Sequence, residues 1–115
     1  QRRLQVILVQ LPDQAAALGR GMMHRLCSEL GSERRVRLRG LGLLIGIEVL
    51  DEDGRPQPAA AVTITERLLR EGVLVLPAGE GGSVVELSPP ATLNSAQVDH
   101  ALERVIAAVR SVCAG

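Results

Sequence analysis

The sequence contains no lysine, because all 13 of its basic residues are arginine. Without a side-chain amine, the chain alone cannot form a Schiff base with a carbonyl cofactor or place a lysine on a phosphate as P-loops do. Phenylalanine, tyrosine and tryptophan are also absent. We therefore expect an aliphatic core, with no aromatic platform for stacking bases or binding a cation.

An excess of charge of one sign is also missing. Acidic residues balance the arginines to a formal net charge of zero, whereas binders of nucleic acid or anionic membranes usually carry a basic excess. The local run Arg34-Arg35-Val-Arg37-Leu-Arg39 alternates with apolar residues, which favours the solvated face of a strand over an anion site. No uncharged run approaches the roughly 18 residues of a membrane span. We expect neither nucleic acid nor membrane as a partner.

The length of 115 residues suits one domain. Cys27 and Cys113 are far apart, each at an apolar helical position, which predicts reduced, buried thiols and a cytoplasmic protein. The start at Gln1 rather than Met is consistent with a fragment of a longer protein. Residues 4–9 suit either a strand or the end of a longer helix, so we treat residues 1–11 as the end of such a helix or a disordered lead-in.

The first half of the chain predicts a helix followed by two strands. Asp13 can cap a helix that Gly31 closes, and two strands, 36–39 and 43–50, follow around the short connection Gly40-Leu-Gly42. Gly46 inside the second strand indicates a bulge or a close neighbour. The apolar stripe of the helix consists of Leu18, Met22, Leu26 and Leu30.

The second half repeats this order and ends in a helix. A helix over 59–71 stops at Gly72, and strands over 73–76 and 84–87 follow, the second ending at Pro89-Pro90. Asn94 and Gln97 have the spacing of a capping box at the start of the last helix. The predicted buried stripes are Ala61, Ile64, Leu68 and Leu69 in the first of these helices, and Val98, Ala101, Leu102, Val105, Val109 and Val112 in the second.

This order predicts the α+β class: a small antiparallel or mixed four-stranded sheet with helices packed on one face, because each helix has one apolar side to bury. The pattern leaves open whether the two hairpins lie side by side or interleave. A ferredoxin-like sandwich is an alternative.

Motifs for cofactors and metals are mostly missing. The glycines from Gly40 to Gly46 miss the dinucleotide-binding spacing and lead into a strand, so backbone geometry explains them better. The acidic turn Asp51–Gly54 lacks the ligand spacing of a calcium loop. His24 and Cys27 share a helix face, but two ligands do not make a metal site. Ser83, Ser88 and Ser95 lack a nucleophile-elbow context.

Glu86 is the polar residue of most interest. Strand alternation places Val85 and Leu87 on one face and Val84 and Glu86 on the other, just before Pro-Pro. The carboxylate can meet a ligand or partner there. The alternative is an exposed carboxylate paired with a nearby arginine.

Three segments, taken in order, resemble the class III, pyridoxal-phosphate-dependent aminotransferases, which include the ornithine, 4-aminobutyrate, acetylornithine and diaminobutyrate enzymes. Residues 39–48 are similar to the family's "RG-x-GL-x-x-G-x-E" hairpin. Residues 68–77 resemble its "ll-x-x-Gvlvlp" segment, and residues 82–90 its "g-x-v-i-R-l-x-PPL" strand. Residues 94–109 match its closing helix in place and polarity.

The resemblance implies that residues 12–115 are the C-terminal small domain of the fold-type I fold, which packs on a large domain and helps to close the active-site cleft. The parent enzyme would move an amino group from an amino acid, with an omega-amino or diamino acid as one option, to a 2-oxo acid, as a homodimer. Pyridoxal phosphate and its lysine would belong to the missing large domain, so the chain alone should be inactive and hold no catalytic, cofactor-binding or metal residue.

Two departures from the family pattern concern the substrate. Glu86 stands where many members carry an arginine that handles a substrate carboxylate or forms an active-site ion pair, and Ala91 replaces the usual leucine after Pro-Pro. We name Glu86 and Arg39 as candidate substrate-side residues. The competing hypothesis is a free-standing α/β module for regulation or oligomerisation, without catalysis.

Overall fold

A computed structural model describes residues 13–41, 44–73, 75–87 and 94–113. Residues 1–11, Ala91 and the Pro-Pro pair, on which several predictions depend, lie outside these ranges. The described elements follow the predicted order of helix, two strands, helix, two strands and helix. They are α2 (Asp13–Leu30), β1 (Val36–Leu41), β2 (Leu44–Val49), α3 (Pro58–Arg70), β3 (Val75–Ala78), the short 3-10 helix η1 (Glu80–Gly82), β4 (Val84–Leu87) and α4 (Ser95–Cys113).

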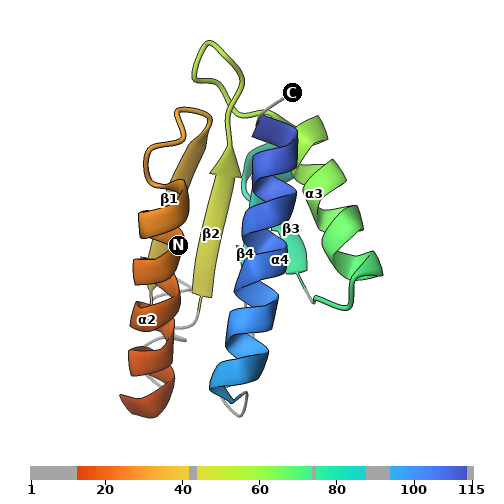
Figure 1. Ribbon diagram of the computed structural model, residues 1–115. Coiled ribbons are helices and arrows are strands. Elements are labelled where there is room, and N and C mark those ends of the chain that lie inside the picture. The colour runs from red at the N-terminus through yellow and green to blue at the C-terminus, as the bar shows by residue number, and fades with distance from the viewer. Residues whose placement is uncertain (1–12, 42–43, 74, 88–93, 114–115) are drawn as a thin grey trace.

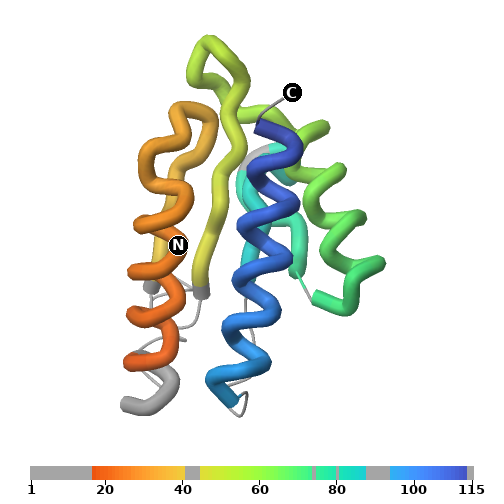
Figure 2. The backbone as a smooth tube through the Cα atoms, viewed as in Figure 1, coloured from red at the N-terminus to blue at the C-terminus, as the bar shows by residue number. Residues whose placement is uncertain are grey.

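Within the described residues, the strands form one four-stranded sheet in the order β1-β2-β4-β3, and every neighbouring pair is antiparallel. The two hairpins therefore lie side by side, and β2 pairs with β4 to join them; the ferredoxin-like alternative is wrong. The described helices all lie on one face of the sheet (Figure 1). Helices α2 and α4 begin at the same end of the sheet, whereas α3 runs in the opposite direction (Figure 2). The predicted α+β class is confirmed.

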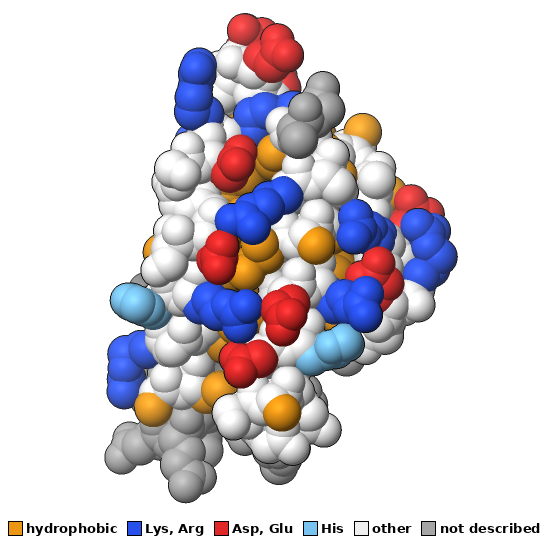
Figure 3. Space-filling view, in the orientation of Figure 1, with side chains coloured by type: hydrophobic (Ala, Val, Ile, Leu, Met, Phe, Trp, Pro, Cys, Tyr) orange, Lys and Arg blue, Asp and Glu red, His pale blue; other side chains and the backbone are white. Residues whose placement is uncertain are grey.

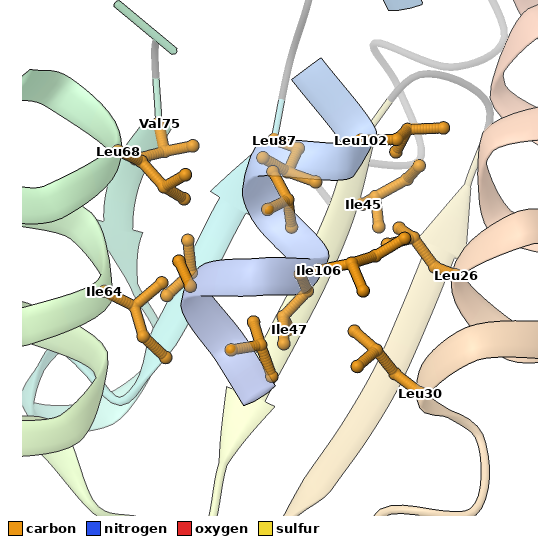
Figure 4. Close-up of a cluster of buried hydrophobic side chains, with 14 of the residues drawn as sticks. Leu26, Leu30, Ile45, Ile47, Ile64, Leu68, Val75, Leu87, Leu102 and Ile106 are labelled. Atoms are coloured by element: carbon orange, nitrogen blue, oxygen red, sulfur yellow. The ribbon is translucent and has the colours of Figure 1, made fainter. Parts of the chain in front are cut away.

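The core lies between the sheet and the helices. Every second strand residue points toward the helices, and Figure 4 shows Ile45, Ile47 and Leu87 meeting leucines and isoleucines of α2, α3 and α4. Burying one aliphatic side chain of this size contributes about 1.5–3 kcal/mol. The core is thus built from aliphatic side chains, as the lack of aromatic residues predicted. The largest fully buried aliphatic side chains are Leu26, Leu30, Ile45, Ile47, Ile64, Leu68, Val49, Val75, Val85, Val105 and Val109.

The third strand begins at Val75, not at Val73 as predicted. The backbone N–H of Val73 donates to the carbonyl of Leu68 at 2.8 Å, and that of Gly72 donates to Leu69 at 3.2 Å. These two bonds form a Schellman motif around Gly72, whose φ is +83°. Val73 thus completes the end of α3, and pairing with β4 starts only after it.

Two predictions of burial are wrong. Leu69 is 50% exposed, because it lies outside the stripe through which Ala61, Ile64 and Leu68 reach the core. Cys27 is exposed rather than buried, while Cys113 is half-buried; both thiols are free.

The start of the last helix is as predicted. The N–H of Gln97 donates to Asn94 Oδ1 at 2.8 Å, and the N–H of Asn94 donates to Gln97 Oε1 at 2.9 Å. This capping box satisfies backbone donors that the first turn leaves without partners. None of the described helices combines the length and hydrophobicity that a membrane crossing needs.

Candidate functional site

The face of the sheet that points away from the helices, which we call the open face, carries both candidate residues. Strand pairing places Arg39 opposite Gly46, Gly46 opposite Glu86, and Glu86 opposite Leu76. Arg39 and Glu86 therefore lie in one row across the sheet, two strand spacings or about 10 Å apart between Cα atoms. The neighbouring row holds Arg37, Glu48, Val84 and Ala78.

Glu48 binds both arginines of β1 that face the open side. Its Oε1 accepts from Arg37 Nη1 and from Arg39 Nη2, each at 3.2 Å. The Glu48 side chain is only 12% exposed, against 55% for Arg37 and 50% for Arg39. The solvated-face interpretation of these arginines is confirmed. They also cover the buried carboxylate of Glu48, which is the last residue of the hairpin motif at residues 39–48. Sequence reasoning missed this role of Glu48, although an acid paired with alternating arginines on the preceding strand was a usable signal.

Glu86 is half-buried. Its backbone pairs with β2 and β3, but within the described residues its carboxylate makes no hydrogen bond or ion pair. The two arginines of β1 on this face both bind Glu48 instead. The sequence interpretation of Glu86 as a carboxylate paired with a nearby arginine is therefore not what the structure shows. As predicted by strand alternation, Val85 and Leu87 are buried on the other face.

Gly46 leaves a position without a side chain between Arg39 and Glu86. Pairing continues through it without a bulge. A Cβ atom added at Gly46 would lie 3.0 Å from Val84 Cγ1. Glycine is therefore needed here because Val84 lies so close. Of the two explanations that the sequence suggested, a bulge or a close neighbour, the second is confirmed.

The opposite side of the molecule is charged but largely paired within itself. Figure 3 shows acidic and basic side chains intermixed over the helices. Arg110 Nη2 lies 2.8 Å from Glu29 Oε1 and Arg25 Nη1 lies 3.3 Å from Asp99 Oδ1, which joins α2 to α4. Glu71 similarly joins α3 to α4 through Arg67 and Arg104. This side has the character of a solvated outer surface.

The remaining sequence candidates do not form sites in the described residues. Asp51 Oδ1 accepts the backbone N–H groups of Asp53 and Arg55, each at 2.9 Å, and the bond from Arg55 is the main reason that the pKa of Asp51 is lowered. The acidic turn is thus a hydrogen-bonded loop. No group of three potential metal ligands occurs in the described ranges, and His24 with Cys27 remains a pair.

Comparison with known proteins gives a consistent result. The family described as aminotransferase class-III matches residues 3–109. An alanine/serine racemase of Pyrococcus horikoshii is 33% identical over 78 residues, which cover 68% of this chain and 16% of that protein. A diaminobutyrate–2-oxoglutarate aminotransferase of Rhizobium meliloti is 29% identical over 102 residues, covering 79% of this chain and 21% of the relative.

Solved structures agree in fold. A phospholyase from Arthrobacter, in complex with phosphoethanolamine, has a TM-score of 0.78 and 26% identity over 93% of this chain and 25% of its own. The ornithine aminotransferase of Toxoplasma gondii has a TM-score of 0.70 and 28% identity over 87% of this chain and 22% of its own. The chain thus spans roughly a sixth to a quarter of the length of these proteins.

Proposed function

Because this chain belongs to the class-III aminotransferase family, we propose that residues 12–115 are the C-terminal small domain of a transaminase that moves an amino group from an amino acid to a 2-oxo acid. The match over residues 3–109, together with the shared fold, is the observation that carries the proposal. Residues 1–11 would end the helix that leads in from the rest of the enzyme. The share of each relative that is covered leaves room for a large domain.

The residues of this chain do not fit pyridoxal phosphate, the family's cofactor, on their own. The sequence has no lysine to bond its aldehyde, and the two open-face arginines of β1 are already bound to Glu48. We therefore assign the cofactor to the large domain, where it would supply the electron-withdrawing ring that amino transfer needs.

We assign this chain the task of shaping and closing the cleft. Within the described residues, the helix side largely pairs its charges internally, whereas the open face has no covering layer (Figure 1) and carries the Glu86 carboxylate without a partner. A sheet with one face packed on helices can place its other face against a second domain. In this arrangement Arg39 and Glu86 would face the substrate side, and the enzyme would work as a cytosolic homodimer.

Expression of two proteins tests this proposal: the complete reading frame that contains this sequence, and residues 1–115 alone. The complete protein should acquire the visible absorbance of bound pyridoxal phosphate and exchange amino groups between an amino acid and a 2-oxo acid. The 115-residue chain should do neither. Cofactor binding and turnover by the short chain alone would contradict the proposal.

Two other outcomes are informative. The racemase relative, at 33% identity, favours racemisation of a small amino acid as a second candidate, so the assay should follow the chirality of the substrate as well as amino transfer. A reading frame without a lysine-bearing large domain would instead support the free-standing regulatory or oligomerisation module.

A further inference from the structure

The sheet has two outer edges, and within the described residues these are β1 and β3 (Figure 1). Successive residues of an antiparallel strand turn their backbone N–H and C=O groups alternately toward one neighbour and the other. Because the N–H of Val49 donates to the carbonyl of Ser83 at 3.1 Å, alternation turns the groups of Glu86 toward β3. Glu86 lies opposite Leu76, so the following Pro77 has its nitrogen at the free edge. Proline has no N–H to donate, which blocks this edge against a further strand.

The outer edge of β1 is not blocked in this way. The N–H of Leu50 donates to the carbonyl of Arg35 at 2.7 Å. Alternation from this bond turns the backbone groups of Arg37 and Arg39 toward β2, and those of Leu38 and Gly40 outward. Gly40 is exposed. An extended segment can therefore form backbone hydrogen bonds with Leu38 and Gly40, which is the recognition mode called β-augmentation.

A pocket lies beside this edge, on the helix side of the sheet. It has a volume of about 270 Å³ and is lined by Gly40 of β1 and by Gly19, Arg20, Met23 and His24 of α2. A Cβ atom added at Gly40 would collide with the methyl group of Met23, so Met23 lies directly over the glycine. In a strand added to β1, the residue opposite Gly40 turns its side chain to this same face. A large apolar side chain at that position covers the glycine and enters the pocket.

On the open face, the same edge carries an unbalanced positive charge. Arg37 and Arg39 are each at least half exposed and share the single carboxylate of Glu48, so one positive charge of this group is left over. Residues opposite Arg37 and Arg39 in an added strand turn to the open face, where acidic side chains pair with the arginines. A second copy of β1 would bring arginines beside arginines instead, which is destabilising.

We propose that the outer edge of β1 binds an extended segment of alternating apolar and acidic residues, and that this segment belongs to the part of the parent enzyme outside residues 1–115. This rests on the proposed function, because it requires a longer parent protein. The stretches of this chain that the structure does not describe contain no aspartate or glutamate, so they do not supply the segment. The added strand extends the sheet and anchors this domain to the rest of the enzyme through backbone hydrogen bonds.

Residue-resolved hydrogen–deuterium exchange of the complete protein tests whether the edge is covered. Rates are compared after correction for the intrinsic rate of each amide. The outward amides of Leu38 and Gly40 should exchange within about 10-fold of the amides of Arg37 and Arg39, which face β2. On a free edge they would exchange at least about 100-fold faster.

Photo-crosslinking of the complete protein identifies the segment. The photoreactive amino acid p-benzoylphenylalanine replaces His24, an exposed residue at the pocket. After irradiation and digestion, mass spectrometry should find a crosslinked peptide from outside residues 1–115 in which apolar and acidic residues alternate. The matched control places the same amino acid at Glu66, an exposed position on α3, and should not capture that peptide.

Neutralising the acids of the captured peptide, by Asp→Asn or Glu→Gln, provides a third readout. It should speed the exchange of the Leu38 and Gly40 amides at least about 10-fold and change that of Arg37 and Arg39 by less than about 3-fold. Circular dichroism confirms that each variant is folded.

Fast exchange of Leu38 and Gly40, in a complete protein that binds pyridoxal phosphate and transfers amino groups, would overturn this inference and leave the proposed function intact. A crosslink to a segment without acids, or to a second copy of this chain, would overturn it as well. A complete protein that binds no cofactor and transfers no amino group would instead refute the proposed function itself.

Discussion

Replacing both arginines that bind Glu48 should cost more stability than the sum of the two single replacements. In Arg37→Met or Arg39→Met, the carboxylate keeps one partner at 3.2 Å. In the double variant it keeps neither. Methionine retains much of the apolar stem, so the perturbation mainly removes charge.

The magnitude follows from the unequal exposure of the three side chains. Each arginine is at least half exposed, so a single pair contributes about 0.5–1 kcal/mol. Glu48 is only 12% exposed, and stranding a buried charge costs about 3–5 kcal/mol when burial is complete. We discount this to about 2–4 kcal/mol for the double variant, which leaves a coupling energy of about 1 kcal/mol or more.

Urea unfolding followed by circular dichroism, with all variants at one pH and salt concentration, measures these free energies. Adding Glu48→Gln to the double variant should restore part of the lost stability, because the stranded charge is gone. As a control, Arg25→Met breaks an exposed pair, in which Asp99 is 62% exposed, and should cost less than about 1 kcal/mol. Additivity of the two single changes within about 0.5 kcal/mol would refute the reasoning.

Further predictions concern single positions. Gly46→Ala should destabilise the protein by about 1 kcal/mol, because the added methyl meets the stiff side chain of Val84 at 3.0 Å. Gly21→Ala, in a helix with open space around it, should stabilise the protein by about 0.5–1 kcal/mol. Melting temperatures equal to that of the wild type would contradict both predictions. Asn94→Ala should cost about 1 kcal/mol in urea unfolding by removing the cap, and an unchanged midpoint would count against the capping box. Burial raises the pKa of the Cys113 thiol, with Glu33 adding to the effect. At mildly alkaline pH the thiolate fraction of Cys113 is therefore smaller than that of an ordinary thiol, and thiolate is the form that iodoacetamide attacks. Labelling followed by mass spectrometry should modify exposed Cys27 first.

Local patterns in the sequence were sufficient for the elements of the fold. The 3.6-residue period located α4, and the Asn94–Gln97 spacing located its start, because a cap involves groups only a few residues apart. Predictions failed where two local signals competed. The apolar run after Gly72 was assigned to a strand, yet its first residue completes the Schellman motif of α3. Leu69 suited the apolar stripe by type but lies on the exposed side of the helix.

The candidate site depended on contacts distant in sequence. Alternation alone placed Glu86 on the face away from Val85 and Leu87, as observed. Its neighbours could not be predicted, because they follow from the pairing of β2 with β4, which brings Gly46 beside Glu86. The same pairing order decides that Arg39 reaches Glu48 rather than Glu86.

By itself, the sequence determined the order of helices and strands, the aliphatic core and the absence of a lysine for cofactor chemistry, because these depend on composition and on short-range periodicity. Only the tertiary structure decided that the hairpins lie side by side. It also decided that, in the described part of the chain, one sheet face is uncovered and that Glu48 is neutralised by arginines while Glu86 is not. Strand order and charge pairing arise from long-range contacts, whose free energy belongs to the assembled sheet and not to any single segment.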